Sequence, residues 1–179
     1  MHVIKNRYLV LLLVSLMIIN PLLTTAALAS FKPAVGETGG LPGEKIAVSS
    51  FDGRLHLWNL DRTNVRNFPK ELKGYVTTSP TMVNVNNDRH GFKEIAVITK
   101  DDNDYYLNIL RNSGSQVSRE FPLALDFIPT ASPVGFDYDD SGRVDLIIGG
   151  EDGNLYLWND MEEETANEKL IITTMKLIV

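Results

Sequence analysis

The sequence repeats itself, and this repeat constrains the fold more than any other pattern in the chain. The segments FDGRLHLWN at 51–59 and EDGNLYLWN at 151–159 share six residues at an offset of 100. A diverged copy, DDNDYYLNILRN, lies between them at 101–112. Similarity at a fixed period indicates an array of structural units, each of which covers the apolar face of its neighbour.

Two further alignments set the length of the unit. NFPKELKGYVTTSP at 67–80 matches EFPLALDFIPTASP at 120–133, with an offset of 53. The short runs KIAV at 45–48, EIAV at 94–97 and DLII at 145–148 follow one another at spacings of 49 and 51. The unit is therefore about 50 residues long and occurs two and a half to three times.

Each unit predicts short β-strands. The three apolar runs are bounded by turn residues, which is typical of strands buried on both faces. Asp52-Gly53 and Asp152-Gly153 predict tight turns, because glycine readily adopts positive φ. After each turn, a leucine pair, Leu55/Leu57 or Leu155/Leu157, alternates with His56 or Tyr156 in the period of a half-buried strand. No helical period follows residue 30, and several short strands in each 50-residue unit are typical of propeller blades.

The order of these motifs resembles a known family. A Ser-Pro pair, an acidic loop, the hairpin DLIIGGEDGNLYLWN at 145–159 and a Phe-Pro pair are similar to the FG-GAP/VCBS repeats of integrin-α-type β-propellers. The resemblance covers about residues 43–160. It implies four-stranded blades around an axis, calcium loops between the first two strands of some blades, and roles in adhesion or ligand binding.

We therefore expect an all-β fold: a partial β-propeller of about three antiparallel blades of up to four strands, preceded by a signal-peptide helix. WD-repeat propellers are the nearest alternative, because DGRLHLWNL at 52–60 resembles their blade-end strand. Their period is about 40–45 residues with a Gly-His signal. The longer period, the absence of a Gly-His pair and the acidic loop favour the FG-GAP type.

One acidic segment predicts a metal site. In DYDDSGRVD at 137–145, oxygen donors occupy positions 1, 3, 5 and 9, which are Asp137, Asp139, Ser141 and Asp145. Arg143 at position 7 offers its backbone carbonyl, and a glycine at position 6 permits the sharp turn. Ca²⁺ binds six to eight oxygen atoms, so this spacing predicts a calcium loop. The alternative is an acidic turn that only solvates a hairpin.

The corresponding segments of the other units are weaker candidates. In NVNNDRHGFKE at 84–94 the donors are Asn84, Asn86, Asp88 and Glu94, with two additional residues and fewer charges. Fewer carboxylates predict weaker calcium binding. In the first unit the matching positions are Glu37, Gly39, Leu41 and Lys45, which do not form a calcium site.

The N-terminus predicts export. Lys5 and Arg7 precede an apolar run from Tyr8 to Ile19, and small residues lead up to Ser30. This is the pattern of a signal peptide at 1–29, and the run is shorter than the approximately 20 residues of a transmembrane helix. The alternative is an uncleaved anchor, which would be the chain's one attachment to a membrane. The expected location is therefore secreted, periplasmic or at the cell surface.

Composition excludes several other functions. The chain contains no cysteine and three histidines, and its net charge is −6. Disulfide scaffolds, thiolate zinc sites and thiol nucleophiles are excluded. An acidic chain without a basic stretch is a poor candidate for nucleic-acid binding. No nucleophile elbow, phosphate loop or cofactor fingerprint is present, so we expect no catalytic or cofactor-binding residues and no enzymatic activity.

The expected organisation follows from these motifs. A linker or incomplete first-blade strand at 30–44 precedes repeats at 45–75, 76–128 and 129–160, and a divergent β-prone tail occupies 161–179. Three units do not close a propeller, which needs four to eight blades. A longer propeller, self-association that closes the ring, and an open arc are the alternatives. In the first of these, the tail is an orphaned strand.

The function predicted from the sequence is an exported calcium-binding propeller repeat protein that acts as a non-enzymatic binding or adhesion module. Its ligand would be a protein or a glycan. The alternatives are the propeller portion of an exported polysaccharide-active enzyme and a WD-like scaffold subunit of an envelope assembly.

Overall fold

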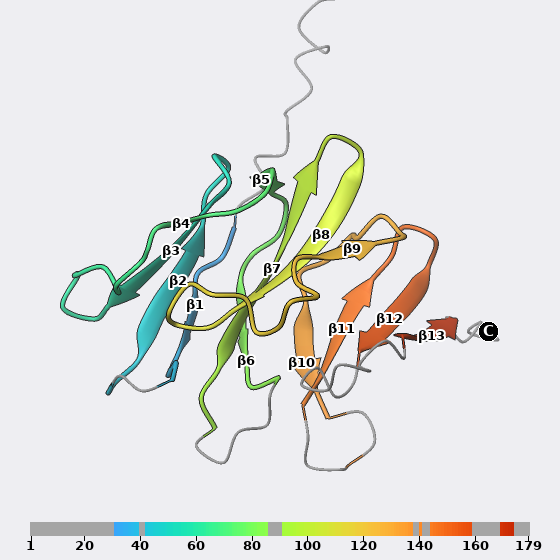
Figure 1. The fold of residues 1–179 in the computed structure, drawn as a ribbon. Helices are drawn as coiled ribbons and strands as arrows, with labels where there is room; N and C mark the ends of the chain where they lie inside the picture. Colours follow the sequence, from blue (N-terminus) through green and yellow to red (C-terminus); the bar gives the residue numbers. More distant parts are fainter. Residues whose placement is uncertain are drawn as a thin grey trace, which may run out of the picture. The chain divides into compact units, whose positions relative to one another are not determined.

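The structure consists of antiparallel β-sheets (Figure 1). It is a computed structural model that describes residues 31–39, 42–85, 91–137, 140 and 144–158, and the backbone of 169–173. All of these belong to one unit, Phe31–Val179. They form 13 strands and no helix, which confirms the all-β prediction. The predicted signal segment lies outside the described residues, among which no helix has the length and apolar character needed to cross a membrane.

The first sheet contains four strands in chain order. They are β1 (Ala34–Gly36), β2 (Lys45–Ser49), β3 (Arg54–Asn59) and β4 (Lys70–Glu71), each antiparallel to the next. The strand β1 lies within the segment for which a linker or an incomplete first-blade strand was expected, and it pairs with β2 along its whole length.

The middle sheet has five strands. They are β5 (Tyr75–Val76), β6 (Thr81–Val83), β7 (Glu94–Asp101), β8 (Asp104–Leu110) and β9 (Leu123–Leu125). Both β5 and β6 pair with β7, at opposite ends of the same edge, and β8 and β9 follow on the other side. Because β5 and β6 share one edge, this sheet has the same width of four strands as the first.

The third sheet repeats the arrangement of the first. Its strands are β10 (Val134–Phe136), β11 (Asp145–Gly149), β12 (Asn154–Trp158) and β13 (Lys169–Thr173), again antiparallel and in chain order. The tail expected to be an orphaned strand therefore supplies β13. Its run of β-prone residues pairs with the edge of β12, which would otherwise expose unpaired N–H and C=O groups.

The repeated hairpins share their turn geometry. Gly53 connects β2 to β3 and Gly153 connects β11 to β12, and both adopt a φ of 80°. This confirms the prediction made from the two Asp-Gly pairs. The repeated Phe-Pro pairs also match, since the Phe68–Pro69 and Phe121–Pro122 peptide bonds are both cis.

A first apolar core joins the first and middle sheets. Its buried residues include Ala47, Leu55 and Leu57 from the first sheet and Ile95 and Val97 from β7. Side chains from the connection after β3 complete it, and the full set is Ala47, Leu55, Leu57, Val65, Phe68, Leu72, Val76, Ile95, Val97 and Leu110. The alternation predicted for Leu55 and Leu57 is confirmed, because both are buried and point to the same side. In β12 the prediction is wrong for two positions: Leu155 is 40% exposed, and Tyr156 is buried in a core.

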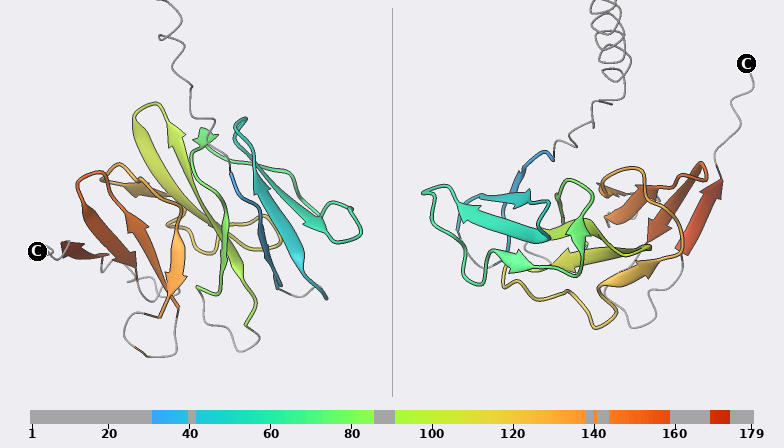
Figure 2. Two further views of the ribbon diagram at one scale, coloured as in Figure 1. Left: turned by 180° about the vertical axis from the view of Figure 1, so that it is seen from behind. Right: turned by 90° about the horizontal axis from the view of Figure 1, so that it is seen from above.

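A second core joins the middle and third sheets. It contains the alternate residues of β7, Ala96 and Ile98, together with residues from β8, β11 and β12. The full set is Val83, Val85, Ala96, Ile98, Leu107, Ile109, Phe127, Leu146, Ile148, Tyr156 and Trp158. Phe127 stacks on Tyr156 with ring centroids 3.6 Å apart. The middle sheet is therefore covered on both faces, as predicted for the run at 94–97, and the three sheets stand face to face in chain order (Figure 2). The same prediction for the runs at 45–48 and 145–148 is not met, because Ile46, Val48 and Ile147 are only half-buried.

Candidate metal centre

The predicted calcium loop connects β10 to β11. Asp137 directly follows β10, and Asp145 is the first residue of β11, where it pairs in register with Phe136. The first and last predicted ligands therefore lie side by side where the loop leaves the sheet. Asp145 is only 5% exposed and Asp137 is half-buried. A buried carboxylate is costly unless hydrogen bonds or a cation compensate its charge.

The middle of this loop is only partly described. Asp140, at position 4 of the loop, is exposed and has a φ of 56°. Asp139, Ser141 and Arg143 lie outside the described residues. Among the described residues, no three His, Cys, Asp or Glu side chains lie close enough together to hold a metal ion. The three unplaced residues include two of the four predicted side-chain donors, so the full ligand set is not tested.

The second predicted loop connects β6 to β7 in the same position of the middle sheet. Glu94, the first residue of β7, is buried, and its Oε2 accepts a hydrogen bond from the Val85 N–H at 3.2 Å. The Asn84 Oδ1 is also buried and has no hydrogen-bond partner among the described residues. Asn86 and Asp88 lie outside that set. An unpartnered buried amide oxygen in the same loop as a buried carboxylate is a local environment that a cation would stabilise.

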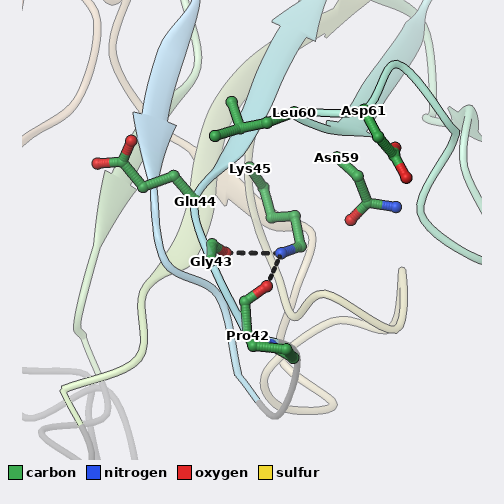
Figure 3. A pocket seen from close by; sticks show the side chains of 7 residues that line it. All are labelled: Pro42, Gly43, Glu44, Lys45, Asn59, Leu60 and Asp61. Atoms are coloured by element: carbon green, nitrogen blue, oxygen red, sulfur yellow. Dashed lines mark hydrogen bonds between the residues drawn. The ribbon is translucent and has the colours of Figure 1, made fainter.

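In the first sheet a lysine occupies the corresponding position. Lys45 begins β2 as Glu94 begins β7 and Asp145 begins β11. Lys45 is 2% exposed, and its Nζ donates hydrogen bonds to the carbonyl oxygens of Pro42 at 3.0 Å and Gly43 at 2.6 Å (Figure 3). Gly43 precedes Lys45 by two residues, just as Arg143, the predicted carbonyl ligand, precedes Asp145. The Lys45 ammonium group therefore binds the Gly43 carbonyl oxygen. In the third loop the corresponding carbonyl oxygen is that of Arg143, which is predicted to bind calcium.

A shallow pocket of about 380 Å³ adjoins this lysine. Its lining residues come from the end of the β1–β2 connection, from β2, from the end of β3 and from the turn after it: Pro42, Gly43, Glu44, Lys45, Asn59, Leu60 and Asp61 (Figure 3). The pKa of Asp61 is lowered from 3.8, first by the hydrogen bond from the Thr63 hydroxyl at 2.6 Å and also by the Lys45 charge. The pocket thus combines the ammonium group of Lys45 with the carboxyl groups of Glu44 and Asp61.

Sequence reasoning missed two features of this region. The first is the role of Lys45, although the change from an acidic residue to lysine in an otherwise repeated KIAV/EIAV/DLII motif was a visible signal. The second is the role of the Ser-Pro pairs. The Lys32 N–H donates to the Ser79 hydroxyl at 2.8 Å, and the Ser79 N–H donates to the Ser132 hydroxyl at 3.1 Å. Ser79 precedes β6 and Ser132 precedes β10, and we call β1, β6 and β10 the inner strands. The hydroxyl of each serine therefore accepts a hydrogen bond from the corresponding residue of the preceding repeat.

The three loops share one end of the described unit. The inner strands β1, β6 and β10 all run toward it, and β2, β7 and β11 all begin there (Figure 1). The loop of the first sheet is therefore stabilised by an ammonium group, whereas the loops of the middle and third sheets offer buried oxygen atoms.

Comparison with known proteins adds no assignment: no family model, no curated protein and no solved structure matches the chain.

Proposed function

We propose that this chain is an exported, calcium-binding β-propeller repeat protein of the FG-GAP/VCBS type and acts as a non-enzymatic binding or adhesion module. Three antiparallel sheets, each four strands wide and packed face to face, support the propeller arrangement. The proposed route of export is the signal-like segment at 1–29. A protein or glycan ligand would bind loops at one end of the sheets.

The observation that carries the metal proposal is the position of Asp145. It is buried at the end of a loop whose sequence also contains Asp137 and Asp139, so three carboxylates fall within nine residues at the start of a buried strand. A calcium ion held by Asp137, Asp139, Ser141, Asp145 and the Arg143 carbonyl would offset their mutual repulsion. The proposed role of the ion is structural, because it would fix the connection between β10 and β11. A second, weaker ion would bind at Asn84, Asn86, Asp88 and Glu94.

Calcium titration of the chain recovered after export tests this proposal. Calorimetry should show saturable binding near one equivalent, and EDTA should lower the melting temperature. At a calcium concentration of 100 times Kd, the expected stabilisation is about 2.7 kcal/mol. For a domain of this size, that corresponds to a shift of roughly 5–10 °C.

Two substitutions in the same loop make the test specific. Asp139→Asn removes a proposed ligand charge while it preserves side-chain shape, and it should abolish the tight binding event. Asp140→Asn is the matched control, because Asp140 is exposed and Asn tolerates positive φ. Absence of saturable binding and of any effect of EDTA on the wild-type chain would exclude the calcium proposal. Equal losses in both variants would exclude this ligand set.

A further inference from the structure

The first and third sheets each have one face whose apolar side chains belong to neither core of the described residues, and some of these side chains are exposed. On the first sheet, Ile46, Val48 and Trp58 lie on the face opposite the core, and the neighbouring Val35 is 51% exposed. On the third sheet, Ile147, Leu155 and Leu157 lie on the face opposite the core. Leu157 is only 2% exposed, whereas Leu155 is 40% exposed. Beside them on β10, Val134 is 53% exposed. Soluble proteins seldom expose several large apolar side chains on one sheet face unless that face has a partner.

The repeat relates these two open faces to the two buried interfaces. We call the side of each sheet that points toward later residues its forward face and the opposite side its backward face. The forward face contains Ala47 and Leu55 in the first sheet, Ala96 and Leu107 in the middle sheet, and Ile147 and Leu155 in the third sheet. The backward face contains Ile46 and Val48 in the first sheet, Ile95 and Val97 in the middle sheet, and Leu146 and Ile148 in the third sheet. These sets follow from the strand registers β2–β3, β7–β8 and β11–β12.

Inside the chain, a forward face packs on a backward face twice. Leu55 of the first forward face shares a core with Val97 of the middle backward face. Leu107 of the middle forward face shares a core with Ile148 of the third backward face. The open surfaces are the third forward face, which contains Leu155, and the first backward face, which contains Val48. They are the two halves of the same type of interface.

We propose that these two faces bind each other between two copies of this chain, so that the molecule is a dimer with a closed ring of sheets. The third forward face of one copy covers the first backward face of its partner, and the same contact recurs in the opposite direction. Two copies of the described unit supply six sheets, and closed propellers contain about four to eight. Three copies would supply nine. The dimer is therefore the closed assembly that the geometry favours, and it continues an interface that already occurs twice in each copy.

One contact differs at the proposed junction. Inside the chain, the residue before each inner-strand proline binds the hydroxyl of the next such residue, Ser79 or Ser132. Across the junction the next residue would be Lys32 of the other copy, which has no hydroxyl. The junction therefore has one hydrogen bond fewer than the internal interfaces, and Lys32→Ser should slow dissociation of the dimer.

The oligomeric state of the chain recovered after export tests the proposal. The ratio of its mass in native buffer to its mass in denaturant should be about two, without larger species. Leu155→Glu places a charge on the third forward face, and Val48→Lys places one on the first backward face. Each variant alone should be monomeric, because both junctions of its dimer would bury an unpaired charge.

A mixture of the two variants provides the specific test. In a mixed dimer, one junction brings the introduced carboxylate opposite the introduced ammonium group and the other junction is wild type. Mixing should therefore restore a species of twice the monomer mass. Glu71→Lys on the exposed outer strand β4 is the control substitution and should leave the dimer intact. Circular dichroism of each variant shows whether its fold is retained.

Three outcomes would overturn the proposal: a wild-type monomer, an open series of larger oligomers, or a mixture of folded variants that remains monomeric. If either variant does not fold, Val35→Glu on the first backward face replaces Val48→Lys in a test for loss of the dimer. The proposal shares the propeller arrangement of the proposed function and does not depend on calcium. A dimer that persists in EDTA with no calcium binding would refute the metal site alone, whereas a calcium-binding monomer would refute the dimer alone.

Discussion

At the scale of single residues, one position of the repeat holds a different buried polar side chain in each sheet. The residue that begins the second strand of each sheet is buried and charged: Lys45, Glu94 or Asp145. Lys45 binds two carbonyl oxygens of its own loop, and Glu94 binds a backbone N–H of its loop. These two side chains thus tie the start of a central strand to the loop before it. The sign of the charge at this position determines whether a loop can gain from a separate cation.

Replacement of Lys45 tests this interpretation. Lys45→Met keeps most of the apolar stem but removes both hydrogen bonds, so the free energy of unfolding should fall by about 1–3 kcal/mol. The decrease should be the same with and without EDTA, because the first loop holds no metal in this scheme. Urea unfolding measures it, with Lys70→Met on exposed β4 as the control. A loss seen only in the presence of calcium would contradict the proposed role.

At the scale of secondary-structure elements, the Asp-Gly hairpins depend on close backbone contacts as well as on turn geometry. Gly53 lies against the backbone of Gly74, and its N–H binds the Ser50 carbonyl at 3.2 Å. The Leu72 N–H in turn donates to the Gly53 carbonyl at 2.9 Å. The hairpin tip of the first sheet therefore also supports the chain segment that enters the middle sheet.

A pair of glycine substitutions separates these two requirements. In Gly53→Ala, a methyl group would meet the Gly74 carbonyl oxygen at a positive φ, so both strain and collision destabilise the fold. In Gly91→Ala the φ is also positive, at 66°, but no described atom lies near the new methyl group. We expect a loss of about 1–2 kcal/mol for Gly91→Ala and a distinctly larger loss for Gly53→Ala. Similar losses in thermal unfolding would argue against a role for the contact.

The sequence predicted those strands whose signal lies in a short stretch of neighbouring residues. The paired strands β2–β3, β7–β8 and β11–β12 follow from apolar runs and turn residues, and they were predicted. The short strands β4 and β9 were not, and β1 was only one of two alternatives for 30–44, because two or three residues carry no period. The role of Lys45 was also missed, since composition alone does not reveal that its ammonium group folds back onto the Gly43 carbonyl. The acidic loop was located by spacing, and its central donors remain untested.

At the scale of the whole molecule, the three sheets differ in how much of their surface is covered by the described residues. The middle sheet contributes residues to both cores, whereas the first and third sheets contribute to one each. Local stability generally follows the extent of burial. The middle sheet is therefore expected to be the most stable part of the described fold.

Amide hydrogen exchange measures this difference. The amides of β7 should exchange most slowly, and those of β3 and β12 should exchange faster at low protein concentration. As the concentration rises, exchange in β3 and β12 should slow, because association covers the open faces by mass action. Exchange in β7 should change little. Uniform protection across all three sheets at every concentration would contradict this ranking.

The matching faces also bear on how such chains change in length over evolution. Both internal contacts join a forward face to a backward face, so duplication of one unit of about 50 residues would add a sheet without the need for a new kind of contact. Loss of one unit likewise brings together two surfaces that already fit. Differences such as Ala47 against Ile147 and His56 against Tyr156 then record how far individual junctions have diverged since duplication. A chain of this design can therefore vary its number of sheets more readily than the chemistry between them.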